Sequence, residues 1–405
     1  MSASPIQSEF RHLVSTSMLA AAAAMLVACG GGSHPHHPPP PPPPPSGVLY
    51  DVIQLIEDAD ADIRVSARGL NEADQVAGTI FAGDDAPSRA FLYNGKRTID
   101  LGDFGGRTAQ AYAINRCGHV TGWAEGAVPN ITQAYLYDGT LRPIGDPSRS
   151  SWPYAISNCD QITGFASFNG QTHAFLYDGT LRDLGTLGGG FSVGNDINDS
   201  GVVLGSSTLP GPLPQVLRAF IYDRRSGAGL QDIGTLGGDY TDAVDLNNAG
   251  QATGTALTAA GLRRAFRYSG GALQDLGTLD GPGGFSTVGQ IINEAGWVIG
   301  TDGARDGRET GFLHDGTRMY AVMLPGERIS RARALNNKGV VVGSSSGPSG
   351  TRAISWTIAG GGVDLNTRLY APPPGLVLTE AQAINDKGSI VALANTGLVL
   401  LRERR

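Results

Sequence analysis

The chain is poor in the residues from which catalytic centres are most often built. It contains 7 histidines and 3 cysteines among 405 residues, and its histidines beyond residue 47 are His119, His173 and His314. These three stand at different places of the repeat described below, so no copy combines a nucleophile, a base and an acid. We therefore expect that the protein is not an enzyme. The alternative is a hydrolase or lyase with a single site at one end of the fold.

One string is nevertheless typical of esterases. Residues Gly343–Gly347 read Gly-Ser-Ser-Ser-Gly, but an esterase serine needs a strand-to-helix elbow with a histidine and an acid beside it. Pro348 follows the string, and no histidine lies downstream. We expect a simple turn here.

Basic surface, helical periodicity and long apolar runs are also missing. A net charge of −7 argues against a nucleic-acid partner. The apolar stretch Met18–Ala28 is short for a membrane span, and no long segment after it has a helical period. Glycine is abundant instead: 59 residues, about twice the usual share. Such a chain has many tight turns.

A motif recurs along the whole chain after residue 66. It reads Ala-x-x-Ile-Asn-x-x-Gly-x-Val-x-Gly and is followed by Arg-Ala-Phe-Leu-Tyr. Its asparagine, which we call the marker, recurs in every copy but the third, where serine replaces it. The markers are Asn71, Asn115, Ser157, Asn198, Asn247, Asn293, Asn336 and Asn385. The mean spacing of about 45 residues lies in the range of four-stranded propeller blades.

Each copy divides into four short pieces rich in β-branched, aromatic or small residues. Examples are Ala111–Ile114 for the first piece, Val340–Val342 for the second, Arg218–Tyr222 for the third and Leu181–Leu184 for the fourth. Such runs, bounded by Gly, Asn and Asp, are typical of strands joined by tight turns. We predict an all-β propeller, with the alanine-rich first strand at the axis and the bulky third strand filling the gap between blades.

The Asn-x-x-Gly unit predicts the turn between the first two strands. Asparagine can accept a hydrogen bond from its own backbone two residues on, and glycine three residues later adopts a positive φ without a clash. Asp74 and Asp160 replace this glycine in two copies, and aspartate tolerates the left-handed region better than most residues. We interpret the marker and the glycine as turn formers rather than as ligand-binding residues.

The two ends of the repeated region predict how the ring closes. The last copy has a first hairpin, Ala381–Ala392, and a third strand, Leu398–Leu401, but no fourth. Near the other end, Leu49–Leu55 resembles a fourth strand with nothing ahead of it. Joining them would complete an eighth blade and remove two exposed edges. Eight blades are therefore favoured; seven, with the last copy as a cap, are the alternative.

The first 28 residues are predicted to be a lipoprotein signal peptide. The apolar stretch ends in Leu26-Val-Ala-Cys29, which resembles the bacterial lipobox, whose cysteine is acylated and becomes the new N-terminus. Gly30 follows, where aspartate would favour retention at the inner membrane. We expect Cys29 to anchor an exported protein in the outer membrane, on its periplasmic or cell-surface side.

Residues 29–47 are predicted to be a linker and 48–405 the propeller. The linker is rich in Gly, His and Pro, and Pro38–Pro45 would form a semi-rigid polyproline stalk. The histidines of His34–His37 lack Cys or carboxylate partners, and Asp58–Asp62 lacks the glycine and glutamate of a calcium loop. We expect no bound metal or cofactor.

The remaining cysteines occupy one repeat position in neighbouring copies. Cys117 and Cys159 each lie two residues after the marker. Export permits a disulfide, and equal positions of adjacent blades face one another, but a bridge needs Cα atoms within about 7 Å. A Cys117–Cys159 disulfide is therefore a possibility, with two free thiols as the alternative.

A second recurring pattern pairs arginine with aspartate. Arginine precedes the Ala-Phe pair of the third strand, and aspartate recurs in the fourth strand. The arginines are Arg89, Arg218, Arg264 and Arg352, and the aspartates are Asp100, Asp183, Asp232, Asp275 and Asp364. We interpret them as a polar connection between strands of one blade. The alternative is a cationic ring on one face that receives an anionic ligand.

These motifs resemble the HAF-repeat family of bacterial extracellular proteins. The resemblance rests on the whole of 48–405: His173-Ala-Phe175, the marker motif, and Asp-Leu-Gly-Thr-Leu-Gly-Gly. It fades in the sixth and seventh copies. It implies an exported repeat protein and no particular activity.

Together these patterns predict an exported lipoprotein, monomeric, whose propeller is a binding scaffold. Its partners would be the bacterial membrane, through the lipid anchor, and an envelope or extracellular glycan, polymer or protein. An enzyme and a purely structural scaffold are the alternatives. Variable loops on a repeated frame are where recognition usually resides.

Overall fold

The computed structural model describes residues 47–57, 63–82, 87–128, 131–212 and 216–404. The predicted signal peptide, Cys29, nearly all of the linker and Asp58–Asp62 lie outside the described residues. No helix in the described ranges has the length and apolar character needed to cross a membrane.

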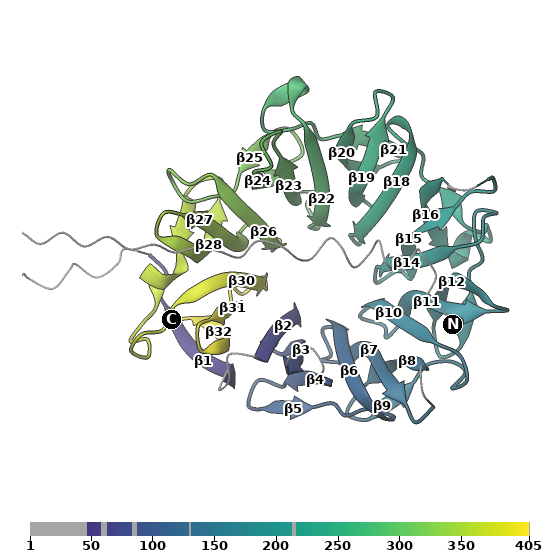
Figure 1. Ribbon diagram of the computed structural model, residues 1–405, viewed down its shortest axis with the longest axis horizontal. Helices are drawn as coiled ribbons and strands as arrows, with labels where there is room; N and C mark the ends of the chain where they lie inside the picture. The colour runs from purple at the N-terminus through teal and green to yellow at the C-terminus, as the bar shows by residue number, and fades with distance from the viewer. Residues whose placement is uncertain (1–46, 58–62, 83–86, 129–130, 213–215, 405) are drawn as a thin grey trace, which may run out of the picture. The chain divides into compact units, whose positions relative to one another are not determined.

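The described chain forms eight antiparallel sheets of four strands each, arranged as blades around a central axis (Figure 1). The prediction of an eight-bladed, all-β propeller is confirmed. In each of blades 1 to 7 the strands follow one another in sequence order, and the first of them, here called the axial strand, lies nearest the axis (Figure 1).

The strands of blades 1 to 4 have the following bounds. Blade 1 comprises β2 (Ile63–Leu70), β3 (Val76–Ala82), β4 (Ser88–Tyr93) and β5 (Thr98–Asp100). Blade 2 comprises β6 (Gly105–Ile114), β7 (Val120–Gly126), β8 (Thr132–Tyr137) and β9 (Leu141–Pro143). Blade 3 comprises β10 (Ser151–Ile156), β11 (Ile162–Phe168), β12 (Gln171–Tyr177) and β13 (Leu181–Asp183). Blade 4 comprises β14 (Ser192–Ile197), β15 (Val202–Thr208), β16 (Leu217–Asp223) and β17 (Gln231–Asp232).

Blades 5 to 8 repeat this plan. Blade 5 comprises β18 (Gly237–Leu246), β19 (Ala252–Thr258), β20 (Arg263–Ser269) and β21 (Ala272–Asp275). Blade 6 comprises β22 (Ser286–Ile292), β23 (Val298–Gly303), β24 (Glu309–His314) and β25 (Met319–Ala321). Blade 7 comprises β26 (Ile329–Leu335), β27 (Val341–Gly347), β28 (Gly350–Thr357) and β29 (Gly361–Asp364). Blade 8 comprises β30 (Leu378–Ile384), β31 (Ile390–Ala394), β32 (Gly397–Glu403) and β1 (Tyr50–Glu57). Short 3₁₀ helices are η1 (Arg224–Ser226), η2 (Gly281–Gly283) and η3 (Leu365–Arg368).

Blade 8 is built from both ends of the described chain. Strand β1 pairs antiparallel with β32, in a register that runs from Tyr50 opposite Glu403 to Glu57 opposite Gly397. A further backbone hydrogen bond joins the Arg404 amide to the Leu49 carbonyl at 2.8 Å. The predicted closure is confirmed, and the seven-bladed alternative is wrong.

The hydrophobic core lies between the blades. Each buried cluster combines two adjacent blades, as where Ala77 and Leu92 of blade 1 meet Ala111 and Tyr135 of blade 2. The third strand supplies the largest buried side chains, among them Phe220, which is fully buried.

The Phe220 ring explains why the marker motif ends in glycine. A Cβ on Gly205 would lie 2.5 Å from the Phe220 ring and 2.1 Å from the Val193 carbonyl oxygen. Only glycine fits beneath the ring.

The esterase-like string is part of a strand rather than the expected turn. Residues 341–347 form β27, and the string's central serine, Ser345, is fully buried. The turn comes only at Pro348 and Ser349. Backbone pairing with β26 and β28 on both sides, which a local pattern does not reveal, overrides the turn tendency of Gly and Ser.

The axial strands share one irregularity that positions the candidate site. In every blade the register against the second strand shifts three residues before the marker, as a β-bulge does. At each shift one residue of the axial strand has no partner on the second strand, and its side chain differs in chemical character from blade to blade. We call these residues the bulge ring: Arg68, Tyr112, Tyr154, Asn195, Val244, Gln290, Arg333 and Gln382.

Candidate functional site

The marker asparagines form a ring of hydrogen bonds around the propeller. Within its own turn each Oδ1 caps the backbone, as Asn71 Oδ1 accepts from the amides of Ala73 at 2.9 Å and Gln75 at 3.0 Å. Each Nδ2 donates to the carbonyl oxygen of the marker residue in the next blade, over 2.9 to 3.2 Å. The bond from Asn385 to Asn71 closes the circuit.

Blade 3 interrupts this marker ring. Ser157 accepts from its own turn at 3.3 and 3.2 Å but makes no bond to blade 4. All eight markers are at most 6% exposed, so these side chains hold the blades together rather than face a ligand. The predicted turn role is confirmed by these hydrogen bonds, whereas the contact between blades could not be predicted from the repeat motif.

The fourth residue of each turn has the predicted positive φ. It is 76° at Gly201 and 92° at Gly388, and 58° and 59° at Asp74 and Asp160. The two aspartates also accept hydrogen bonds from the preceding blade: Asn385 Nδ2 donates to Asp74, and Asn115 Nδ2 to Asp160. Aspartate therefore supports the left-handed turn and binds the neighbouring blade at once.

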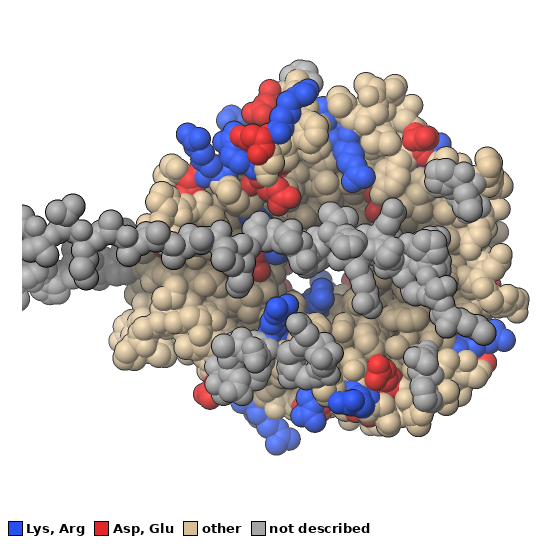
Figure 2. All heavy atoms as spheres, viewed as in Figure 1, with Lys and Arg blue, Asp and Glu red and all other residues tan. Residues whose placement is uncertain are grey.

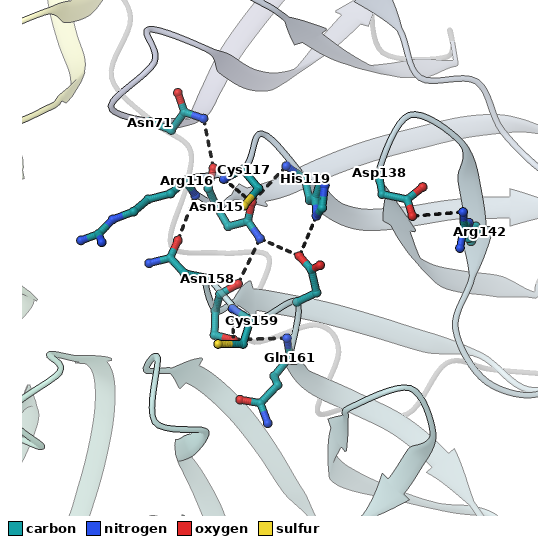
Figure 3. Close-up of polar contacts among 12 residues, drawn as sticks. Asn71, Asn115, Arg116, Cys117, His119, Asp138, Arg142, Asn158, Cys159 and Gln161 are labelled. Carbon is teal, nitrogen blue, oxygen red and sulfur yellow. Dashed lines mark hydrogen bonds and ion pairs between the residues drawn. The ribbon is translucent and has the colours of Figure 1, made fainter.

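A second ring lies one residue after the marker, at one end of the axis. We call it the mouth ring: Glu72, Arg116, Asn158, Asp199, Asn248, Glu294, Asn337 and Asp386. Most members accept a hydrogen bond from the backbone amide of the preceding blade, as Asn158 does from Arg116 at 2.9 Å (Figure 3). All four carboxylates of this ring are engaged in this way.

The inner wall of the propeller surrounds an opening at the centre of the ring (Figure 2). The bulge ring belongs to this wall, because its members lie on the axial strands and are partly or fully exposed. Some members contact a side chain or the backbone of the adjacent axial strand. The Tyr112 and Tyr154 rings are 5.6 Å apart, and Gln382 Oε1 accepts from the Ala67 amide at 2.9 Å.

One side of this wall is aromatic. Tyr154 is 36% exposed, and its ring lies 5.8 Å from that of Phe165. Phe165 in turn stacks on Trp152, with ring centroids 4.8 Å apart and planes at 22°. Tyr112 continues the series into blade 2, and the Arg68 guanidinium lies 5.5 Å above its ring. We call these five side chains the aromatic strip.

The arginine of the strip has no carboxylate partner, and the Tyr154 phenol is buried enough to resist ionisation. Desolvation, with Tyr112 close by, raises the pKa of Tyr154 from its ordinary value of 10 to about 12; with either value the phenol is a hydrogen-bond donor at neutral pH. No carboxylate among the described residues pairs with Arg68, or with Arg116 at the mouth. The opposite wall differs, since Arg333 Nε donates to Glu380 at 2.9 Å.

The recurring arginines lie elsewhere, in the outer half of the blades. Arg89, Arg218 and Arg352 pair with the fourth-strand aspartate of their own blade at 3.3, 3.7 and 3.4 Å. In the copy with histidine, His173 pairs with Asp183 at 3.0 Å. These diagonal pairs join the two outermost strands of a sheet.

Arg264 is the exception. It is 4% exposed, and its guanidinium donates to the carbonyl oxygens of Gly284 and Phe285, both at 3.1 Å. It fixes the connection into blade 6. Its aspartate counterpart, Asp275, instead accepts from the Gly277 amide at 2.8 Å, which shapes the turn after the strand.

Both cysteines are exposed and free, so the possible Cys117–Cys159 disulfide is not formed. Each cysteine belongs to its own turn (Figure 3): the Cys117 amide donates to Asn115 Oδ1 and the Cys159 amide to Ser157 Oγ. The two turns are joined one residue earlier, where Arg116 donates to Asn158. The contact between blades here is made by asparagine and aspartate rather than by sulfur.

A histidine–aspartate pair lies beside these cysteines. His119 Nδ1 is 2.7 Å from Asp160 Oδ1 (Figure 3), but no serine, threonine or cysteine of the described chain is hydrogen-bonded to the His119 ring. An oriented base without a nucleophile does not make a catalytic triad. Within the described ranges no three His, Cys, Asp or Glu side chains come together to hold a metal.

Two further carboxyl groups interact across the boundary of blades 4 and 5. Asp196 accepts from the Leu246 amide at 2.7 Å, and Asp245 from the Ile292 amide at 2.6 Å. Burial raises the pKa of Asp196 to about 6. Burial and the neighbouring charge of Asp196 raise the pKa of Asp245 well above its ordinary value. Both groups bind the axial strand of the next blade.

Comparison with known proteins establishes the fold. Neither a family model nor a curated protein matches the sequence. Among solved structures, the β-propeller domain of the Trilobed protease from Pyrococcus furiosus is similar, with 14% identity, a TM-score of 0.50, and coverage of 77% of this chain and 99% of that one. That propeller is described as having an open velcro topology, whereas here β1 closes blade 8.

Two peptidases are similar over part of their length. Porphyromonas gingivalis dipeptidyl peptidase 4 has 10% identity and a TM-score of 0.53, with 82% of this chain and 57% of that one covered. A prolyl endopeptidase has 10% identity and a TM-score of 0.51, with 85% and 54% covered. The chain thus spans little more than half of each peptidase. At such identities the likeness shows a β-propeller and assigns no activity.

Proposed function

We propose that this chain is an exported, membrane-anchored lipoprotein of the HAF-repeat type whose propeller binds an envelope or extracellular ligand on its inner wall. The observation that carries the proposal is the aromatic strip. Ligand sites combine apolar and aromatic surface with a few placed polar groups, and Trp, Tyr and Arg dominate binding energy where they are accessible. Of the two walls of the opening, this one offers such a surface.

A binding role fits the rest of the molecule better than catalysis. The marker ring, the mouth ring and the arginine–aspartate pairs all serve to hold blades or strands together. His119–Asp160 lacks a nucleophile, and Asp196 and Asp245 are occupied by backbone amides. The peptidases of similar fold support a hydrolase as the second candidate, with the Asp196–Asp245 pair as its acid–base group.

A ligand screen tests the proposal. The full-length lipoprotein in detergent, and a Tyr154→Ala variant with an unchanged melting curve, would be applied to an array of envelope glycans and peptides. We expect array signals that the variant loses, together with no turnover in an esterase, glycosidase, lyase and peptidase panel. Turnover abolished by Asp245→Asn would favour the enzyme, and an array without signals would contradict the binding role.

The anchor is tested separately. Metabolic labelling with an alkyne fatty acid should mark the wild-type protein and not a Cys29→Ser variant, because only the cysteine thiol and its new amino group accept acyl chains. Protease shaving of intact cells then assigns the periplasmic or the surface side. Label on the Cys29→Ser protein would contradict the predicted lipidation site.

A further inference from the structure

We infer that the inner wall of blades 1 to 3 binds a carboxylated glycan, with sugar rings on the aromatic strip and carboxylates on Arg68 and Arg116. The inference rests on the proposed binding function and adds the ligand class and the contact residues to it.

The aromatic part of the surface has the form that a pyranose ring requires. A pyranose has one face of C–H groups, which packs on an aromatic ring whose face is electron-rich. Tyr112 and Tyr154 are neighbours at 5.6 Å on two adjacent axial strands, and Tyr154 is accessible. Phe165 contacts the Tyr154 ring and is itself stacked on Trp152, so the Tyr154 ring is held in place before a ligand arrives.

The charge of the surface selects an acid. Arg68 contacts the ring of Tyr112, and Arg116 follows four residues after Tyr112 at the mouth. Neither guanidinium has a carboxylate partner among the described residues, and both are exposed. A guanidinium binds a carboxylate through two parallel hydrogen bonds. The four mouth-ring carboxylates each accept a backbone amide and keep their negative charge, so the attraction for an anion is local to the two guanidinium groups.

The opposite wall offers no equivalent surface. The arginine of the bulge ring in blade 7, Arg333, is bound to Glu380. Val244 of blade 5 is 39% exposed but has no aromatic neighbour in its ring. Asp242 accepts from Ser206 Oγ at 2.6 Å, so this wall offers a carboxyl group rather than a cation. Positive charge and aromatic rings therefore coincide on one side of the axis.

Three hexameric probes separate charge from ring stacking. They are hexagalacturonate, its methyl ester, and cellohexaose, each titrated by calorimetry into the full-length lipoprotein in detergent. We expect hexagalacturonate to bind at least about tenfold more tightly than the ester, and more weakly as salt rises, because screening weakens exposed charge pairs. Trp152 should report binding by a change in fluorescence that a Trp152→Phe variant lacks.

Two variants and a matched control assign the contacts. Arg68→Gln should weaken hexagalacturonate about tenfold and leave the ester unchanged, since one charge-assisted contact is lost. Tyr154→Ala should weaken all three hexamers. Val244→Ala, at the position equal to Arg68 across the axis, should leave the affinity for all three hexamers unchanged. If Tyr154→Ala fails to fold, Tyr154→Phe keeps the ring, and it should retain most of the affinity.

The outcomes distinguish this inference from the proposed function. Equal affinity for acid and ester would overturn the carboxylate preference and leave a glycan-binding wall. A proline octapeptide that binds while every hexamer fails would overturn the glycan and favour a polyproline ligand. No binding of hexamers or peptide would overturn the inference, while the wider array still decides the binding function.

Discussion

The gap in the marker ring at Ser157 can be filled by one substitution. In Ser157→Asn the new Nδ2 would donate to the Asn198 carbonyl, as the other markers do to their neighbours over 2.9 to 3.2 Å. Gln161, four residues on, would be its second partner, as Gln75 is for Asn71. The turn hydrogen bonds, 3.3 and 3.2 Å with serine, would shorten towards those of the asparagine turns.

The expected gain is small but measurable. One buried hydrogen bond contributes about 0.5–1.5 kcal/mol, from which fixing the longer side chain subtracts about 0.5 kcal/mol. A net gain of about 0.5 kcal/mol, and at most about 1 kcal/mol, raises the melting temperature of a domain of about 360 residues by roughly 1 °C. Urea denaturation followed by circular dichroism measures the same gain as a higher midpoint at constant slope.

The reverse substitution is the matched control. Asn293→Ser places in blade 6 the residue that blade 3 already has, and removes the bond to Asn336 at 3.2 Å. It should lower the stability by about 1–2 kcal/mol. A Ser157→Asn protein that is no more stable than wild type, beside an Asn293→Ser protein that is less stable, would show that blade 3 is adapted to serine. Two neutral variants would refute the stabilising role of the ring.

Three further predictions concern stability. Asp245→Asn should stabilise the protein by about 1–2 kcal/mol at pH 8 and by little at pH 4, because the raised pKa values of Asp196 and Asp245 make ionisation costly in the folded state. Melting curves recorded across this pH range measure the effect. Arg264→Ala should cost about 3–5 kcal/mol in urea denaturation, since buried carbonyls lose their donor, whereas Arg89→Ala, with a side chain 69% exposed, should cost under about 1 kcal/mol. Gly205→Ala should cost about 3 kcal/mol in the same assay, because its Cβ meets backbone at 2.1 Å.

The controls follow from the same physics. A carboxyl group whose pKa is higher in the folded state than in the unfolded state adds stability that is complete below pH 4 and disappears as the pH rises through about 6. The melting temperature of Asp245→Asn should therefore fall less with rising pH than that of the wild type. Parallel pH profiles of the two proteins would contradict an interaction between Asp196 and Asp245. Equal losses for both arginine variants would contradict the burial argument. Gly229→Ala, whose Cβ meets nothing within 4 Å, should be near neutral or slightly stabilising, because alanine restricts the unfolded chain. A comparable loss of stability there would contradict the steric argument.

The repeat predicted the blades because the residues that form each turn and each strand lie within a single copy. Asn-x-x-Gly fixes a turn, alternating apolar residues fix strands, and the unpaired strands at the two ends predicted how blade 8 closes. Contacts between blades could not be predicted in this way. The marker turn looks the same whether Asn115 Nδ2 faces water or the Ser157 carbonyl, and only the spacing of neighbouring blades decides between them.

The candidate site was missed for a related reason. Bulge positions have no residue preference of their own. In the sequence, Arg68, Tyr112 and Tyr154 therefore look like random variation inside an otherwise regular first strand. That irregularity was the available signal, because a place that varies within a repeated frame is free to serve a ligand. For the cysteines, regularity was the wrong guide: equal positions suggested a bridge, but both thiols are free. The turns are joined instead by the residues one position earlier.

The pairing of β1 with β32 sets an order of events during biogenesis. The outermost strand of blade 8 leaves the ribosome first and finds its partner last, after more than 300 intervening residues have been made. Contacts so distant along the chain form slowly, because the loop between them must first be ordered. Until then seven four-stranded sheets and the three-stranded sheet of β30 to β32 form an open ring, so a chaperone that delays folding would have a long interval in which to act.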